Sequence, residues 1–293
     1  MRGILQVTRE LQIVRLTRYD ESFTGHLIPA DIIAAALSRP TLRAETILDG
    51  IFAECVIIVE ADGDRLVYQT TLETLSNEIR IDAHFAAVGG TSGISAPSIL
   101  YRKLSIPCVV IADLDLIADV DRLRTIVNAM VPGDAAKALV EEARNVACEI
   151  QKMSPSITSN EFEAELKAIN AMANNMGKDS YPDVRQKLNH LAGRLDRLGN
   201  LKSGGISQLP NDIAPIVESF IGKLKQAGIF LVPVGQLEDW LASEKISASK
   251  KNKWAWANEA ALVIQANGAR KGDIWDFLRE VAQHLRRQLK APM

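Results

Sequence analysis

The sequence has few of the residues that build disulfide frameworks or zinc sites, and it has no long apolar run. Its 293 residues include three cysteines and four histidines, with no paired metal-ligand spacing among Cys55, Cys108 and Cys148 and no HxH or HxxxH pair. No apolar segment approaches the ~20 residues that cross a bilayer, and MRGILQVTREL has no signal-peptide pattern. We therefore expect a cytoplasmic protein with reduced, structural cysteines, no zinc and no membrane partner.

The sequence also lacks an excess of positive charge. Thirty-four basic residues stand against 36 acidic ones, so no global field marks a nucleic-acid binder. A polyanionic substrate would have to be held by local basic groups or by metal. Hydrophobic residues make up 47% of the chain, which is enough for at least one full core.

Apolar strands that alternate with amphipathic helices predict a parallel α/β sheet. The expected strands are Cys55–Val59, Arg80–Val88, Ile106–Ala112 and Ile229–Val234, and the expected helices include one through Leu75 and one over Ala96–Leu104. A short hairpin of Gly3–Val7 and Leu11–Leu16 is expected before them.

Residues 134–205 have helical periodicity and no strand candidate, which predicts a helical insertion. It ends at Lys202-Ser-Gly-Gly205, which we interpret as a flexible joint. The spacing of its leucines fits either an exposed homodimer seam or packing within the same domain; these are Leu188, Leu191, Leu195 and Leu198. The predicted domains are residues 1–50, 51–133, 134–205 and 206–293.

Acidic residues follow three of the predicted strands. Glu60 ends the first, Asp113 and Asp115 follow the third, and Glu238 lies four residues after the fourth. Ligands bind beyond the carboxyl ends of parallel strands, so these carboxylates can converge, and converging carboxylates need a cation. Oxygen ligands without His or Cys indicate Mg²⁺ or Mn²⁺. Asp62, by contrast, fits a turn or a helix cap.

A strand that ends in Glu and a later strand that ends in Asp-x-Asp resemble the Toprim domain of topoisomerases, primases and some nucleases. The closer resemblance is to the OLD (overcoming lysogenization defect) nucleases, whose first motif matches Glu60 and Asp64 in EADGD. Asp113-Leu-Asp115 resembles their second motif and Gly235-Gln-Leu-Glu238 their third, with Gln236 at the usual serine position. Lys271 is the candidate for the family's C-terminal lysine.

The resemblance implies a Toprim-like, Rossmannoid parallel sheet flanked by helices, and hydrolysis of DNA by two Mg²⁺ or Mn²⁺ ions in anti-phage defence. The implied catalytic residues are Glu60, Asp113, Asp115 and Lys271, and the implied metal ligands are Glu60, Asp64, Asp113, Asp115 and Glu238. OLD proteins carry an ABC-type ATPase, yet GxxxxGK[ST] is absent here. Since residues 1–50 resemble the end of such an ATPase, we expect a C-terminal portion or a split system with the ATPase as partner.

A lysine-rich segment is the candidate for DNA binding, because basic residues beside aromatics suit phosphates and bases. Its residues are Lys245, Lys250, Lys251, Lys253 and Trp254, with Trp256 beyond them. A solvated loop next to core tryptophans is the alternative. GGTSGIS, from Gly89, fits either a phosphate-binding loop or an ordinary strand-to-helix turn.

Two other functions fit the acids. A Toprim fold without turnover could serve as a regulatory or assembly subunit, which the departure at Gln236 favours. Asp113-Leu-Asp115 could also form an aspartyl-phosphate site, although such folds carry that motif on their first strand or pair one acceptor with a later lysine.

Overall fold

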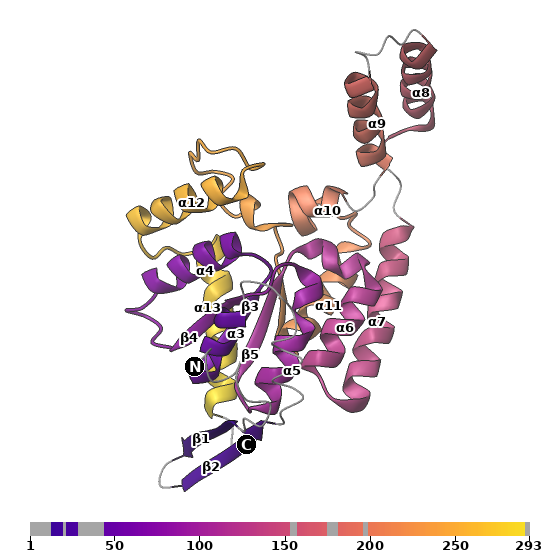
Figure 1. The fold of residues 1–293 in the computed structure, drawn as a ribbon. Helices are drawn as coiled ribbons and strands as arrows, with labels where there is room; N and C mark the ends of the chain where they lie inside the picture. Colours follow the sequence, from indigo (N-terminus) through magenta and orange to yellow (C-terminus); the bar gives the residue numbers. More distant parts are fainter. Residues whose placement is uncertain are drawn as a thin grey trace.

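A four-stranded parallel sheet forms the centre of the structure (Figure 1). The computed structural model describes residues 13–19, 22–28, 44–152, 157–174, 181–195 and 199–290. The order across the sheet is β4 (Ala83–Ala87), β3 (Cys55–Val59), β5 (Cys108–Ala112) and β6 (Ile229–Leu231). All three neighbouring pairs are parallel. The predicted parallel α/β fold is therefore confirmed.

Helices cover both faces of this sheet, because every residue of β3, β5 and β6 is buried. Val56 and Ile58 belong to the core on one face, and Ile57 and Val59 to the core on the other. The first face is covered by α5 (Ser95–Lys103), α6 (Val120–Met130), α7 (Gly133–Gln151) and α11 (Ala214–Gln226). The second is covered by α4 (Asp62–Thr74), α12 (Lys253–Asn267) and α13 (Asp273–Lys290).

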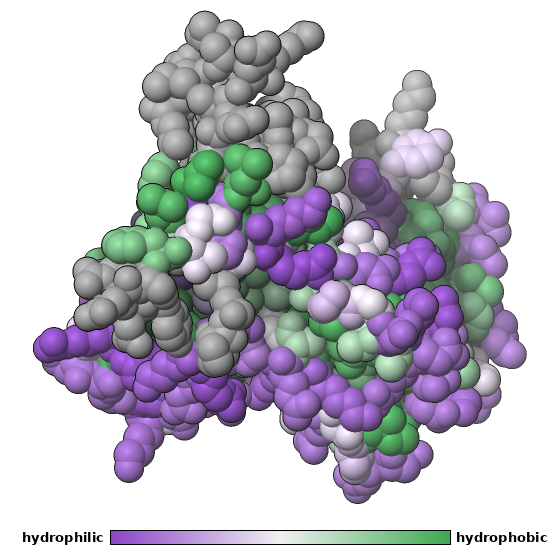
Figure 2. Space-filling model, turned by 90° about the horizontal axis from the view of Figure 1, so that it is seen from below, coloured by the Kyte–Doolittle hydropathy of each residue, from purple (hydrophilic) through white to green (hydrophobic). Residues whose placement is uncertain are grey.

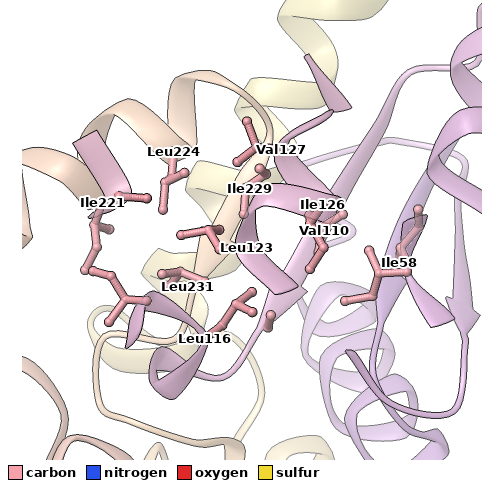
Figure 3. Packing of buried hydrophobic residues seen from close by; sticks show 14 of the residues in the cluster. Ile58, Val110, Leu116, Leu123, Ile126, Val127, Ile221, Leu224, Ile229 and Leu231 are labelled. Carbon is pink, nitrogen blue, oxygen red and sulfur yellow. The ribbon is translucent and has the colours of Figure 1, made fainter. Parts of the chain in front are cut away.

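Figure 3 shows the first of these cores. Leu123 and Ile126 of α6 and Leu224 of α11 lie around Val110 and Ile229 of the two strands. Burying such side chains contributes roughly 1.5–3 kcal/mol each, so this layer fixes the positions of the strand ends above it. No helix in the described ranges is long and apolar enough to span a membrane.

The predicted insertion, residues 134–205, has two unlike parts. Helix α7 packs into the main core through its apolar stripe. Helices α8 (Ser159–Asn174) and α9 (Tyr181–Leu195) stand apart from the sheet in Figure 1. Their separate small core consists of Ile157, Ile169, Val184 and Leu191. Leu188, from the predicted seam, is 47% exposed.

The N-terminal β segment is an antiparallel hairpin of β1 (Ile13–Tyr19) and β2 (Ser22–Ile28). The strand predicted at Gly3–Val7 lies outside the described residues. The described part of the second predicted strand, residues 13–16, belongs to β1, which pairs with the residues that follow it. Only Asp20 and Glu21 separate the two strands in the sequence, a loop length that favours a hairpin.

The remaining elements are short. They are α3 (Ala44–Asp49), η1 (Gly50–Phe52), η2 (Thr91–Gly93), η3 (Leu114–Ala118), α10 (Gly199–Gly204), η5 (Gly205–Gln208) and η6 (Leu237–Asp239). Four of them, η2, η3, α10 and η6, lie near the carboxyl ends of the strands, where the predicted site lies.

Candidate metal centre

Five acidic side chains meet where the parallel strands end. Glu60 directly follows β3, and Asp113 directly follows β5. Asp115 belongs to η3, Asp64 to the first turn of α4, and Glu238 to η6 after β6. The charges of Glu60, Asp64 and Asp115 act on Asp113, and those of Glu60 and Glu238 act on Asp64. All five residues predicted as metal ligands therefore lie at this edge of the sheet, linked through the charges that act on Asp64 and Asp113.

Burial and mutual repulsion disfavour the charged forms of two of these acids. Burial and, after it, the charge of Glu60 raise the pKa of Asp113 to about 7. Burial raises the pKa of Asp64 to about 6, although the hydrogen bond that its carboxylate accepts from the Ala61 N–H opposes this rise. A divalent cation among these groups would favour the charged forms, because an opposite charge lowers a carboxyl pKa.

The acids are held by separate partners within the protein. Glu60 accepts a hydrogen bond from the Thr91 hydroxyl at 2.9 Å and one from the Asp113 N–H at 3.4 Å. Asp115 lies 3.1 Å from the ammonium of Lys202, and Glu238 lies 3.7 Å from that of Lys253. Positive and hydrogen-bonding groups therefore offset much of the charge that the cluster concentrates.

The cluster has the oxygen donors of a metal centre, but these donors are not arranged around one point. Among the described residues, no group of three or more His, Cys, Asp or Glu side chains could hold a metal ion as it stands. The side chains themselves fit Mg²⁺ or Mn²⁺, since they offer carboxylate oxygens and no soft ligand. An ion that binds Asp115 Oδ2 or Glu238 Oε1 would displace the lysine paired with that oxygen.

Two glycines pack the third acidic segment against α10. Gly235 has φ +110°, and a Cβ there would lie 2.5 Å from the Lys202 carbonyl oxygen. Gly205 has φ +66°, and a Cβ there would collide with the carbonyl of Pro233. The Leu114 N–H also donates to the Gly235 carbonyl at 2.9 Å. The segment from Lys202 to Gly205 is therefore a packed helix end, and its interpretation as a flexible joint is wrong.

The GGTSGIS turn holds the end of β3 through its first amides. The N–H groups of Gly89 and Gly90 both donate to the Glu60 carbonyl at 2.8 Å. The N–H of Gly93 donates to the Gly90 carbonyl within the turn. Because these amides are engaged, the turn supports Glu60 rather than offering them to a phosphate.

Glu259 of α12 anchors the lysine-rich segment that precedes the helix. Its carboxylate accepts hydrogen bonds from the N–H and hydroxyl of Ser247 and from the N–H of Ala248, at 2.7–3.0 Å. Lys250 lies 2.8 Å from Asp239, beside Lys253 on Glu238. Two of the lysines predicted to bind DNA therefore reach the acidic edge.

The two tryptophans of α12 differ in exposure. Trp254 is 57% exposed, whereas Trp256 is buried in the core. Lys245 and Lys251 are exposed on the same segment. Trp254 is thus accessible beside the lysines, as base stacking would require.

The structure does not bring Lys271 to the acids. It lies in the turn between α12 and α13. Its neighbour Arg270 lies over the Trp275 ring, and the indole N–H of Trp275 donates to Thr74 at the last residue of α4. Asp64 lies in the first turn of α4, which has 13 residues. At 1.5 Å per residue the two ends of this helix are about 20 Å apart. Lys202 and Lys253 are lysines that pair with two of the five acids.

A buried tyrosine beneath the acids was not predicted. Tyr68 is 2% exposed, and its hydroxyl accepts a hydrogen bond from the Trp240 indole N–H at 3.4 Å. Burial and the charges of Asp64, Asp113 and Glu238 raise the pKa of Tyr68 well above its ordinary value. One signal was available in the sequence, because Tyr68 lies four positions after Asp64 on the same helix face.

Tyr68→Phe is expected to destabilise the protein by about 1–3 kcal/mol, because the Trp240 N–H is left buried without an acceptor. Urea unfolding measures this. In the control, Trp240→Phe is combined with Tyr68→Phe, and the double variant should lose less than the sum of the two single losses. Simple additivity would contradict the predicted contact.

The comparison with known protein families concerns the first part of the sheet. Residues 51–115 match the family model for the TOPRIM domain of overcoming lysogenization defect protein-like proteins. This segment holds Glu60, Asp64, Asp113 and Asp115 and is an OLD-like Toprim segment. The resemblance predicted from these residues is confirmed there.

Two of the solved structures that are similar to the chain come from OLD proteins of different bacteria. The C-terminal region of the Xanthomonas campestris pv. campestris OLD protein is 14% identical with a TM-score of 0.33, covering 81% of this chain and 97% of that one. The C-terminal region of the Burkholderia pseudomallei OLD protein is 18% identical with a TM-score of 0.35, covering 81% and 99%. No residue role follows from likenesses this weak. No curated protein matches.

Proposed function

We propose that this chain is a metal-dependent nuclease domain that hydrolyses phosphodiester bonds in DNA with two Mg²⁺ or Mn²⁺ ions. One observation carries the proposal: five carboxylates from four segments lie at the carboxyl edge of a parallel sheet. The OLD-like Toprim segment supports a nuclease-type domain. A role in anti-phage defence with an ABC-type ATPase follows from the same resemblance.

In this proposal the acids divide into two groups. Glu60 and Asp64 hold one ion, and Asp113, Asp115 and Glu238 hold or share the other. Two ions held by these residues would supply activation of water and stabilisation of the leaving oxygen. Thr91 and the Asp113 N–H orient the two oxygens of Glu60.

A lysine completes the proposed site by stabilising charge on the scissile phosphate. The resemblance assigns this role to Lys271. Lys253 is a candidate from its position, because its ammonium lies 3.7 Å from Glu238. Replacing either lysine with methionine and measuring cleavage at saturating metal would distinguish them.

Plasmid cleavage tests the proposal directly. The purified chain should nick or cut supercoiled DNA with Mn²⁺ or Mg²⁺, and EDTA should stop the reaction. Glu60→Gln should remove the activity. Asp62→Asn is the matched control, since Asp62 lies two residues away and pairs with Arg65 at the surface. Equal losses in both variants would count against a specific role for Glu60.

The lysine-rich segment, with Lys245, Lys250, Lys251, Lys253 and Trp254, is the proposed DNA contact. Trp254→Ala is expected to weaken binding of single-stranded DNA about 10-fold, since stacking of one base is worth roughly 1–3 kcal/mol. Fluorescence anisotropy measures the affinity. Leu262→Ala on the same helix is the control, because Leu262 is 64% exposed and also apolar. Unchanged affinity in Trp254→Ala would remove this residue from the interface.

An ATPase partner is proposed to dock on the β1–β2 hairpin. Val14, Leu16, Phe23 and Leu27 are each more than half exposed there. Figure 2, which views this end of the molecule, shows hydrophobic atoms gathered among largely hydrophilic ones.

A homodimer through α8 and α9 is a separate proposal, which a molecular mass from solution scattering would test.

The second candidate function is a Toprim subunit without turnover that binds nucleic acid or an ATPase. The separate partners of the acids favour it, because Lys202 and Lys253 neutralise positions that a metal would need. Metal binding with intact DNA, even in the presence of the ATPase, would support this candidate over the nuclease.

A further inference from the structure

Lys202, near the C-terminal end of the predicted helical insertion, contacts the acid cluster. Its ammonium donates to Asp115 Oδ2 at 3.1 Å. With Glu60, Thr91 and Asp113 it lines a cavity of about 760 Å³ beside the acids. A lysine is a cation at neutral pH, and Lys202 lies in an ion pair with the Asp115 carboxylate.

The backbone of α10 fixes this position. Leu201 is 1% exposed, and the carbonyl oxygens of Leu201 and Lys202 lie against Gly235 so closely that a Cβ would not fit. The Ile206 N–H donates to the Pro233 carbonyl at 2.9 Å. The backbone of Lys202 is thus tightly packed, and its side chain extends toward Asp115 and is 47% exposed.

We infer that Lys202 is a built-in counter-cation that holds Asp115 until a divalent metal binds and then contacts the phosphate of the substrate. The inference rests on the proposed metal-dependent nuclease. The ammonium of Lys202 occupies Asp115 Oδ2, so an ion that binds this oxygen must displace it, and Lys202 and the metal compete. The released ammonium stays at the cavity, because its backbone is fixed, and there it meets an anionic substrate.

If Lys202 competes with the metal and also contacts the substrate, its removal should raise the metal affinity and lower the cleavage rate. Lys202→Met should bind Mn²⁺ about 5-fold more tightly, since removing one nearby positive charge strengthens cation binding. The same variant should cleave DNA at least ~10-fold more slowly at saturating Mn²⁺, because a charge that stabilises the transition state is lost. A merely structural lysine would weaken both properties.

Calorimetry of Mn²⁺ binding and plasmid cleavage, measured on the full chain, test this. Lys223→Met is the matched control: Lys223 is 50% exposed and pairs with Glu142 at 2.6 Å, near the end of α11 that leads into β6. It should change neither property. Lys202→Arg keeps the charge and should keep wild-type metal affinity, and unfolding midpoints confirm that each variant folds.

Weaker or unchanged Mn²⁺ affinity in Lys202→Met overturns the inference, as does unchanged cleavage at saturating metal. If the wild type binds Mn²⁺ but cuts no DNA, the proposed nuclease fails while the affinity result still decides the counter-cation role. If the wild type binds no Mn²⁺, both fail.

Discussion

Replacing Asp113 with asparagine is expected to reduce metal-dependent DNA cleavage by ~10²- to 10³-fold. Mutating a residue that only supports the ligands of a metal site already lowers metal affinity or activity by roughly 10- to 100-fold, and Asp113 is a proposed ligand itself. Asp113 follows the central strand β5 and interacts with the charges of Glu60, Asp64 and Asp115. It therefore interacts with three of the other four carboxylates. Asparagine keeps its size and removes an anionic ligand.

A second aspartate beside the same cavity provides the control. Asp121 also lines it, but its side chain is 83% exposed and pairs with Arg124 on the surface of α6. Asp121→Asn should retain cleavage within about two-fold, since screened surface pairs contribute little. Cleavage rates at saturating Mn²⁺ compare the two. A fully active Asp113→Asn variant would refute the two-metal assignment.

The sheet and its acids could be predicted because their signals are local. Val56 to Val59 form a continuous apolar run, as a strand buried on both faces requires. Glu60 follows this run at once, so the end of the strand and its carboxylate were visible together. The same holds for Asp113 after β5.

The division of roles within EADGD could be predicted only in part. Asp62 was interpreted as a turn or cap residue, and in the structure it is the first residue of α4 and pairs with Arg65. The hydrogen bond to the N-terminal backbone comes from Asp64, which accepts from the Ala61 N–H at 2.9 Å. Both acids fit a helix N-terminus by type, so the choice depended on side-chain direction.

The lysines of the site could not be predicted from spacing. Lys202 meets Asp115 across 87 positions, with the insertion between them. Lys253 was predicted as a DNA contact and in the structure also pairs with Glu238. Lys271 was selected by its place near the C-terminus, but α12 leads the chain away from the acids before that residue. Such pairings depend on where helices end in space.

Metal-free protein is expected to lose about 2 kcal/mol of stability as the pH rises from about 4 to about 8, because Asp113 and Asp64 lose their protons in this range. Each unit of pKa shift corresponds to about 1.4 kcal/mol, and the sum is reduced because solvent reaches part of both side chains. The folded pKa values of Asp113 and Asp64, about 7 and about 6, lie above those of an unfolded chain. The folded state therefore binds more protons in this window, and its stability falls as they leave.

Urea unfolding in EDTA at pH 4 and pH 8 measures this loss, and Asp113→Asn isolates its source. The variant should match the wild type at pH 4, where Asp113 is protonated in the folded protein and the unfolded aspartate only begins to ionise, and exceed its stability by about 1–2 kcal/mol at pH 8. Excess Mn²⁺ should reverse the order, because an ion at 100 times its Kd stabilises the folded protein that binds it by about 2.7 kcal/mol. Lower stability of the variant at pH 8 in EDTA would contradict a repulsive cluster. The repulsion that costs the metal-free protein stability is also what favours metal binding, because an ion that neutralises the acids relieves it.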